Sequence, residues 1–417
     1  MQNFAPSGAL WRHAGFLRLW AAQTVSSFGS RIAREGFAMS AILSIRATPA
    51  ELGVLAALAR GPGAVVGLFA GGIVDRRSRR RVMIASDLAR TALIATVPLA
   101  AWMDVLTMPQ LYLVAALAGA ASVFFDIADH AFLPSLIARE HLLDGNAKLG
   151  LTEAVAEIGG PAVAGILFQL FTPPFAMLGT ALTYLVSALF LLAVPVRELP
   201  AEKTRKPWHE DIGLGLRAVL DEPLVRPLLG MTVVFSGFGA FFAPLYLLYG
   251  IKVLGLSPAL MGITIACGGV GALLGASLSN LLTRRIGIGP TIWGCCFVYT
   301  ASLLLVPLAQ GPVWRATTML MIAQLGGDGF AAAFMIPITS LRQAVLPRAV
   351  LGRTAGLFSA VSGIVTVLGA ILGGLLGGWI GIREALLISV AGMAAAPIFV
   401  LFSPLRSLKT IPVSAPA

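Results

Sequence analysis

The residues of this sequence that could take part in chemistry are ionisable side chains that interrupt long apolar runs. Arg31, Arg34 and Glu35 lie in one such run, and Arg60 lies in the next. In a helix Glu35 follows Arg31 by about one turn, so the two can form an ion pair. Charged groups in apolar segments are costly and usually face a polar cavity or one another. Two interpretations follow: a cavity wall that contacts a substrate or transfers protons, or an Arg31–Glu35 pair that holds helices together.

Four carboxylates in later apolar runs are candidates for the same chemistry. Asp126 and Asp129 lie near the end of one run, and Glu153 and Glu157 lie one turn apart near the start of another. Burial favours the protonated form of a carboxyl group, whereas a nearby arginine favours the charged form. Glu157 has no arginine within four residues in the sequence, so burial alone is expected to govern its proton binding. We rank Glu35 and Glu157 ahead of Asp126 as proton carriers.

Other charged residues in apolar runs receive simpler interpretations. Asp328, which lies between Gly327 and Gly329, is the deep acid of the second half of the chain. It either carries protons or forms a hydrogen bond within an unwound turn of its helix. Asp87 and Arg90 are three residues apart and are expected to form a structural pair.

Nothing in the sequence indicates catalysis. The four histidines are scattered, and the three cysteines lie in apolar runs as small apolar residues rather than as metal ligands or disulfide partners. No Gly-x-x-x-x-Gly-Lys-Ser/Thr loop occurs, so ATP is not the direct energy source. We expect no catalytic residue, no metal site and no cofactor, and the chain is not expected to be an enzyme.

The elements that position these residues follow from the composition. The chain has 417 residues, of which 57% are hydrophobic and only 12% are charged. Soluble domains average about 25% charged residues, and a chain of this length has no core large enough to bury so much apolar surface. Cytosolic enzymes, secreted disulfide scaffolds and disordered chains are excluded. The composition predicts an all-α polytopic membrane protein.

A spanning helix needs about 20 apolar residues, and turn signals such as Met108-Pro109 and Ser257-Pro258 separate many runs of this length. Twelve spans are predicted, at residues 17–45, 51–74, 82–102, 109–133, 150–171, 174–196, 227–250, 258–282, 288–308, 314–341, 354–379 and 383–403. The longest polar interruption divides them into two six-helix bundles. The predicted organisation is an N-terminal bundle at 1–196, a central loop with an amphipathic helix at 197–223, and a C-terminal bundle at 224–417.

The distribution of basic residues predicts the orientation. With both termini in the cytoplasm, 22 of the 30 lysines and arginines fall on the inner side and four on the outer side. Inner loops of membrane proteins carry such an excess, so both termini are expected to be cytoplasmic. The same distribution explains the net charge of +11 without a nucleic-acid partner.

Weak internal symmetry relates the two halves. The basic pair Arg79-Arg80 recurs as Arg284-Arg285, at an offset of 205 residues. Parallel repeats of six helices are a transporter architecture. The second copy is incomplete, because Ser279 stands where Asp75 predicts an acid.

The loop after the second predicted span resembles the signature loop of the major facilitator superfamily. The matching residues are Gly71, Asp75, Arg76, Arg79 and Arg80. A carboxylate among arginines can latch helix ends in one conformation and release them in another. The resemblance implies that this loop is a gate, with Asp129 as the partner of a loop arginine.

Further segments resemble the efflux branch of that superfamily, which includes enterobactin exporters and macrolide efflux pumps. They are residues 16–29, 86–90 and 125–137. Gly160, Pro161 and Gly165 resemble the kinked motif of drug and proton antiporters. The resemblance implies a monomeric secondary transporter of the bacterial inner membrane. It is expected to export a small organic molecule, such as a drug, a siderophore or another amphipathic metabolite, in exchange for protons.

One departure from the family pattern affects this expectation. Ala115 stands where the fourth span usually carries an arginine, so proton coupling requires another group. Two alternatives stay open: an importer or facilitator of a polar solute on the same fold, and, more remotely, a membrane scaffold without transport activity.

Overall fold

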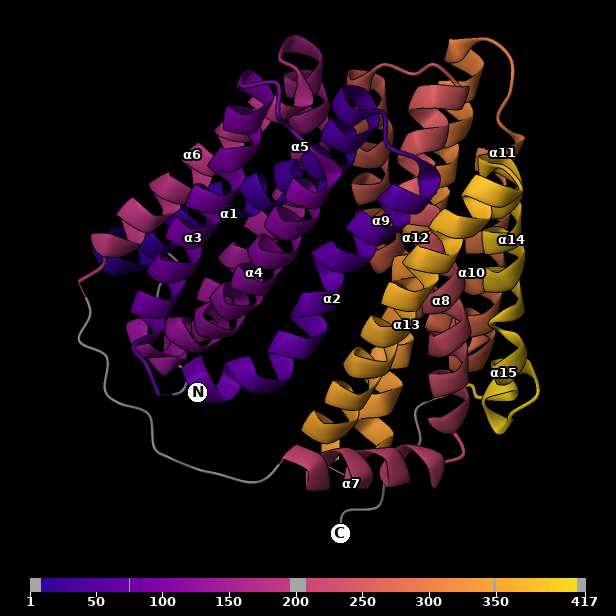
Figure 1. Ribbon diagram of the computed structural model, residues 1–417. Helices are drawn as coiled ribbons and strands as arrows, with labels where there is room; N and C mark the ends of the chain where they lie inside the picture. The colour runs from indigo at the N-terminus through magenta and orange to yellow at the C-terminus, as the bar shows by residue number, and fades with distance from the viewer. Residues whose placement is uncertain (1–8, 75, 196–207, 348–349, 411–417) are drawn as a thin grey trace. The chain divides into compact units, whose positions relative to one another are not determined.

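The computed structural model describes residues 9–74, 76–195, 208–347 and 350–410, and this part of the chain is helical without a strand (Figure 1). Proline occupies the first or second position of several helices, where an N–H would have no helical partner. Examples are α4 (Met108–Leu136) and α9 (Pro258–Ile286). The side chain of Ser257 caps α9 by accepting a hydrogen bond from Leu260 N at 3.3 Å.

Ten helical segments of the described chain are long and apolar enough to cross a membrane. They are α3 (Arg79–Trp102), α4, α5 (Leu142–Leu170), α6 (Pro173–Leu192), α8 (Arg226–Leu248), α9, α10 (Ile288–Leu303) with α11 (Leu305–Leu308), α12 (Val313–Val345), α13 (Leu351–Trp379), and α14 (Ile382–Ala395) with α15 (Ile398–Leu401). The helices α1 (Ala14–Met39) and α2 (Pro49–Val74) have 26 residues each but are not among the ten. The charged residues of α1 reduce its hydropathy.

The chain forms two compact units. One contains Met1–Ala47 and Leu58–Arg205, and the other contains Thr48–Ala57 and Lys206–Ala417. The start of α2 therefore packs with the second unit, where Gly53 lies against Gly374 of α13. The division predicted at 197–223 stays a prediction, because residues 196–207 lie outside the described part.

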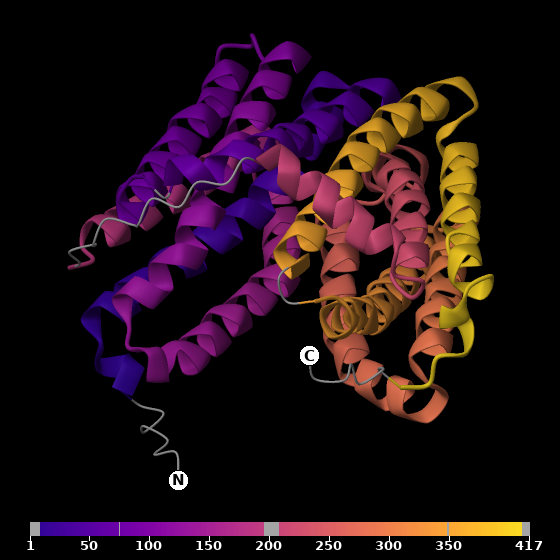
Figure 2. The same cartoon turned by 90° about the horizontal axis from the view of Figure 1, so that it is seen from below.

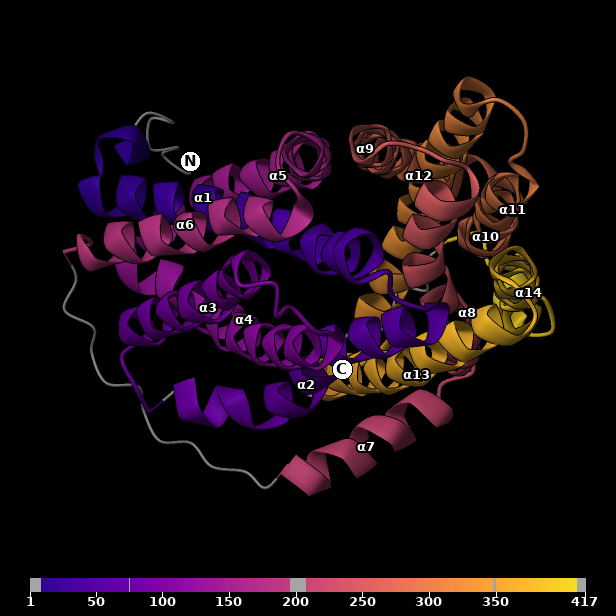
Figure 3. The same ribbon diagram turned by 45° about the horizontal axis from the view of Figure 1, so that its top comes forward.

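In the first unit α1 packs against α5 and α6, and α3 packs against α4 and α6 (Figure 3). Small residues at these contacts let the helices approach closely. Gly29 of α1 faces Thr183 of α6, with no room for a side chain between them. Buried apolar side chains such as Phe16, Met83 and Phe132 fill the core.

In the second unit the closest helix pair is α9 and α12. A side chain at Gly275 would overlap the backbone of Gly329, and one at Gly271 would overlap that of Leu325. The aromatic rings of Phe235, Tyr299 and Phe334 pack against one another at centroid distances of 5.2–6.1 Å. On α8 itself, Phe241 and Tyr246 are buried, whereas Phe235, Phe238 and Phe242 are partly buried.

The amphipathic segment of the central loop is a helix, as predicted. This helix, α7 (Trp208–Leu220), crosses the end of α13 (Figure 2). Val219 is buried, and Gly215 lies against the backbone of Arg353. Leu214, Leu216 and Leu220 are exposed. Exposed leucines on an amphipathic helix suit the interfacial region of a bilayer.

The first helix of each half ends in the same unusual way. α1 continues into a π-helix at Ser40–Ile45, and α8 continues into one at Tyr249–Val253. π-helices account for well under 1% of residues in proteins. Their occurrence at matching ends agrees with the internal symmetry of the sequence.

Candidate functional site

The first unit contains a polar cavity of about 560 Å³ between α1, α3, α4 and α5. It brings together five of the predicted residues, namely Arg31, Arg34, Asp126, Asp129 and Glu153. They come from three helices that are separated in the sequence. The cavity therefore has the mixed charge that polar substrates or protons require.

Arg31 is the centre of an ion network between α1 and α5. Its Nη2 lies 2.7 Å from Glu157 Oε2 and 3.4 Å from Glu153 Oε1. Arg34 Nη1 lies 3.3 Å from Glu157 Oε1. The side chain of Arg31 is 17% exposed, whereas those of Glu157 and Glu153 are 42% and 69% exposed. The arginine is thus held in the protein, and the carboxylates remain accessible to protons and to substrate.

These contacts correct two sequence predictions. Arg31 pairs with the carboxylates of α5 and not with Glu35, which lies on its own helix. Glu157 has two arginine neighbours, although none is near it in the sequence. Both predictions were wrong because they considered contacts within one helix only. Glu35 interacts electrostatically with Arg34 and with Arg60 of α2.

The glycines of α5 explain how Arg31 reaches these carboxylates. A Cβ on Gly160 would lie 2.5 Å from Arg31 Cβ, and one on Gly159 would lie 3.3 Å from Phe28. Pro161 and Gly165 are buried in the same helix, which runs without interruption through the proline. The predicted antiporter-like motif therefore makes the close contact between α1 and α5, and its kink stays a prediction.

A second charged pair is more deeply buried than this network, and the sequence analysis did not predict that it lies at the cavity. Asp87 and Arg90 of α3 form an ion pair with side-chain exposures of 0% and 2%. The guanidinium of Arg90 lies over the rings of Phe125 and Tyr184, at 4.4 and 4.1 Å from their centroids. Arg90 also lines the cavity. The three-residue spacing predicted the pair, but nothing local in the sequence indicated the cavity.

The surroundings of this pair make each member dependent on the other. Arg90 donates to Ser26 of α1 and Ser122 of α4, both at 3.4 Å. Among the described residues, Asp87 Oδ2 and Arg90 Nε have no hydrogen-bond partner. Removing one member of a buried ion pair typically costs about 3–5 kcal/mol, because the other charge is left uncompensated. The pair therefore links α1, α3 and α4 at the back of the cavity.

Asp129 has a different partner from the one predicted. It accepts a hydrogen bond from Gln23 of α1. Arg79, one of the loop arginines, donates to Ala131 O at 3.0 Å. The predicted ion pair between Asp129 and the loop is thus absent from the described contacts. Gln23 is the missed residue, and only the packing of α1 against α4 reveals it.

The described loop residues hold the ends of helices. Arg80 Nε donates to Leu191 O at 2.7 Å at the end of α6, and Arg18 donates to Ala193 O just beyond it. The last carbonyls of a helix lack helical partners and attract cations. Arg76 lines a pocket of about 690 Å³ between α2, α3 and α4. Asp75 lies outside the described residues, and Gly71 is described only as part of the α2 backbone.

Asp328 of the second unit lies in an uninterrupted helix. Its carboxylate faces Gly268 of α9, where a side chain would overlap it. The predicted unwound turn is therefore wrong, because the neighbouring glycines serve close helix packing: Gly329 faces Gly271 of α9, and Gly327 faces Leu303 of α10. Asp328 keeps its place as a candidate carrier of the second half.

An all-helical chain with many membrane-crossing helices and a charged cavity among them has the architecture of a multi-pass membrane transporter. The chain belongs to the transmembrane secretion effector family of the major facilitator superfamily, which it matches over residues 3–416. It is 25% identical to the MFS-type transporter YfiS of Bacillus subtilis (strain 168), over 90% of this chain and 89% of that protein. It is 28% identical to the enterobactin exporter EntS of Salmonella choleraesuis (strain SC-B67), over 73% and 72%.

Solved structures share the fold at lower identity. The nucleoside transporter NupG has a TM-score of 0.73 and 14% identity, over 94% of this chain and 98% of its own. A bacterial homologue of the iron transporter ferroportin has a TM-score of 0.71 and 17% identity, over 93% and 98%. The resemblance to this superfamily that the sequence indicated is confirmed. A small-molecule substrate and a lipid environment follow from the family.

Proposed function

We propose that the protein is a secondary active transporter that exports a small organic molecule in exchange for protons. The observation that carries this proposal is the ion network of Arg31, Arg34 and Glu153, which line the cavity of the first unit, with Glu157. The similarity to enterobactin exporters supports the outward direction. The substrate class is a drug, a siderophore or another amphipathic metabolite.

The cavity chemistry suits an exchange of this kind. Glu153 and Glu157 accept either a proton or the cation or hydrogen-bond donor of a substrate. A proton that binds to a carboxylate oxygen neutralises it and displaces a substrate held there. Arg31 then loses a counter-ion and becomes available to other anions. Competition for the same oxygens provides the mutual exclusion that antiport requires, because substrate and proton occupy the site in turn during alternating access.

Arg90 replaces the arginine that the fourth span lacks. Ala115, at the family position, is buried and apolar, whereas Arg90 reaches α4 from α3 through Ser122 and Phe125. An arginine at this depth can respond to the charge of nearby carboxylates. Glu35, Asp126, Glu153 and Glu157 stay the candidate proton carriers of this half, with Glu157 first because it lies closest to Arg31.

The membrane topology belongs to the same proposal. With α1 and α2 counted, the chain has twelve spans, and both termini lie in the cytoplasm of a bacterial inner membrane. The charge distribution supports this orientation. A reporter that functions only in the cytoplasm is expected to be active when it is fused after Lys409. Activity of a reporter that functions only on the outer side would contradict the topology.

The gate of the proposal is the loop with Asp75, Arg76, Arg79 and Arg80. The bonds of Arg79 and Arg80 to carbonyls of α4 and α6 support a role in holding helix ends together. Asp75→Asn is expected to slow transport without loss of insertion. Unchanged transport in this variant would remove the gate from the mechanism.

Import or facilitated diffusion of a polar solute is the second candidate, since the solved structures with this fold include a nucleoside transporter. Purified protein in proteoliposomes distinguishes the two. A compound panel is loaded and its release is followed with and without a proton gradient that drives protons against the substrate flow. Accelerated release supports proton-coupled export, whereas gradient-independent exchange or gradient-driven uptake would contradict it.

A further inference from the structure

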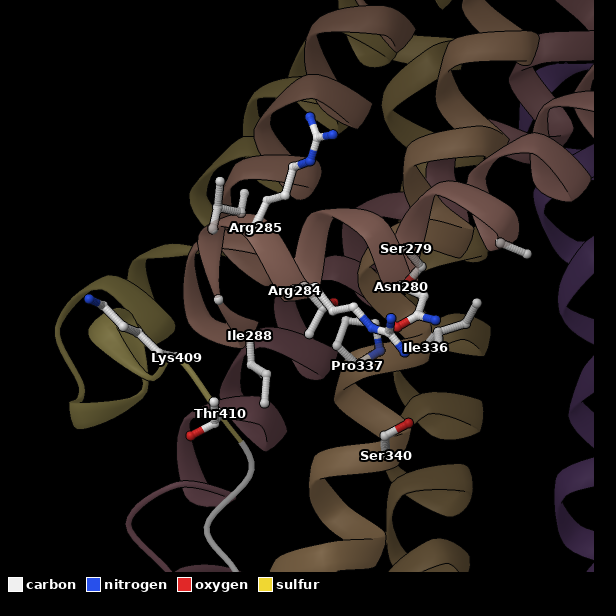
Figure 4. Close-up of a pocket in the computed structure, with 14 residues that line it drawn as sticks. Ser279, Asn280, Arg284, Arg285, Ile288, Ile336, Pro337, Ser340, Lys409 and Thr410 are labelled. Atoms are coloured by element: carbon white, nitrogen blue, oxygen red, sulfur yellow. The ribbon is translucent and has the colours of Figure 1, made fainter.

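The second unit contains a cavity of about 780 Å³ at the end of α9. It is bounded by the last turns of α9, by α12 and by the segment that follows the last helical turn of the chain (Figure 4). Its polar side chains include Asn280, Arg284, Ser340, Lys409 and Thr410. Neither the transport proposal nor the family match assigns a role to this cavity.

Backbone contacts build the cavity and fix its far wall. Gly289, in the first turn of α10, donates its N–H to Leu408 O at 2.9 Å. A side chain at Gly289 would overlap Leu405 O, and Gly287 turns the chain with a φ of +97°. These glycines let the terminal segment lie directly on the α9–α10 corner. Lys409 and Thr410 are thereby held beside the cavity.

The cavity is positively charged and lacks a compensating acid. Arg284, Arg285 and Lys409 line it together with no carboxylate, and none of the three forms an ion pair with a described residue. In Figure 4 the guanidinium of Arg284 lies beside the amide of Asn280, while Arg285 and Lys409 turn their charged ends outward. Arg284 is thus the inner cation, and the other two form the rim.

Internal symmetry shows what this half of the chain lacks. Arg79 and Arg80, the counterparts of Arg284 and Arg285, bond to carbonyls of neighbouring helices. In the second half Ser279 replaces the acid of the signature loop, and its Oγ donates to Ala333 O at 2.9 Å. An anion from outside the chain would therefore complete the second copy.

The depth of the cavity and its apolar walls indicate the source of such an anion. α9 has 29 residues, or about 44 Å at about 1.5 Å per residue, which matches a bilayer of about 40–45 Å with its headgroups. Arg284 and Arg285, near the end of α9, would then lie at headgroup depth. Ile286, Ile288 and Ile336 supply apolar surface around the same opening.

We propose that this cavity binds the phosphate group of an anionic membrane lipid. Arg284 and Asn280 contact the phosphate, Arg285 and Lys409 add positive charge at the rim of the cavity, and the isoleucines contact the glycerol and acyl carbons. Basic pockets between membrane helices bind lipid headgroups of this kind. The bound lipid bridges α9, α12 and the terminal segment.

Native mass spectrometry of the full-length protein provides the test. The protein is delipidated and titrated with phosphatidylglycerol, with phosphatidylcholine as the zwitterionic comparison. Arg284→Gln and Lys409→Gln are compared with Arg406→Gln, which removes the same charge nearby but does not line the cavity. Each cationic side chain near an anionic lipid surface is worth about 1 kcal/mol, or about fivefold in affinity. The two cavity variants are expected to lose about this factor for phosphatidylglycerol alone, and Arg284→Lys should recover part of it.

A second experiment distinguishes a lipid headgroup from a free anion as the ligand. Inorganic phosphate is added to the protein in phosphatidylcholine nanodiscs, and the unfolding temperature is measured. Equal loss of lipid in all three glutamine variants would overturn the proposal, because a general surface charge would then explain the binding. A rise in unfolding temperature with inorganic phosphate that depends on Arg284, without any preference for phosphatidylglycerol, would overturn the lipid assignment in favour of a free anion. None of these measurements depends on transport, so they stand apart from the export proposal.

Discussion

Arg31 of α1 and Glu157 of α5 lie 2.7 Å apart, joined across two helices that neighbour each other in space but not in sequence. The contact makes Glu157 a counter-ion and a candidate proton carrier at once. A proton that binds Glu157 must weaken its hold on Arg31, so the state of the carboxylate is transmitted to α1.

Replacement of this carboxylate tests the coupling. Glu157→Gln is expected to reduce gradient-driven export about tenfold, which corresponds to about 1.4 kcal/mol of lost coupling, while passive substrate exchange continues. Glu140→Gln is the matched control, since the Glu140 side chain is 71% exposed and does not line the cavity. Proteoliposome flux with and without the gradient measures both. Full driven export in Glu157→Gln would exclude this residue as the carrier.

The close contact at Gly160 predicts a stability effect. In Gly160→Ala the new methyl would lie 2.5 Å from Arg31 Cβ, and overpacking of this kind costs about 1–3 kcal/mol. Gly179→Ala in α6 is the control, because a Cβ there meets no atom within 4 Å. We expect a lower unfolding temperature in detergent for the first variant only. Equal unfolding temperatures in the two variants would show that α5 can move away from Arg31 at little cost.

The buried pair on α3 predicts a non-additive result. Asp87→Asn and Arg90→Gln should each destabilise the protein by about 3–5 kcal/mol. The double variant should lose less than the sum of the two, since no uncompensated charge remains. Unfolding in denaturant measures the free energy of unfolding of the two single variants and the double variant. Transport assays on the double variant then test whether Arg90 is needed for export. Normal export by a stable double variant would limit the pair to a structural role.

The bond from Arg80 to the end of α6 predicts local fraying. Arg80→Gln removes donors to Leu191 O and Leu192 O, and a cation at a helix C-terminus contributes about 0.3–1 kcal/mol. Hydrogen exchange at the last turn of α6 should become about two- to fivefold faster, by the same energies. Arg77→Gln, a nearby exposed variant without such bonds, should leave that exchange unchanged. Comparable protection in both variants would show that Arg80 does not support α6.

The sequence predicted the membrane-crossing helices well where apolar runs and prolines coincide. The run from 258 corresponds to α9, which begins at Pro258. The fifth span was expected from 150, whereas α5 begins at Leu142. Its first two turns are polar and helical, and Lys148 pairs with Asp144 one turn before it. Hydropathy locates the part of a helix that lies in lipid and omits the part that extends into water.

The candidate site was predictable in its members but not in its contacts. Arg31, Glu157 and Asp129 were found because ionisable groups in apolar runs are rare. Their partners were assigned within one helix or from the family pattern, whereas the actual partners come from helices distant in the sequence. Gln23 and Arg90 could not be assigned to the cavity for the same reason. Such assignments require knowledge of which helix faces meet.

The glycine contacts between α9 and α12 have a mechanical consequence. With Gly275 against Gly329 and Gly271 against Leu325, the two backbones touch and no side chain separates them. Because no flexible side chains lie between these backbones, we expect the two helices to move together as one rigid body. A displacement of α9 near Arg284 is therefore expected to move the part of α12 that carries Asp328. Binding at the end of α9 would thus be coupled to the position of Asp328 in the interior of the second unit.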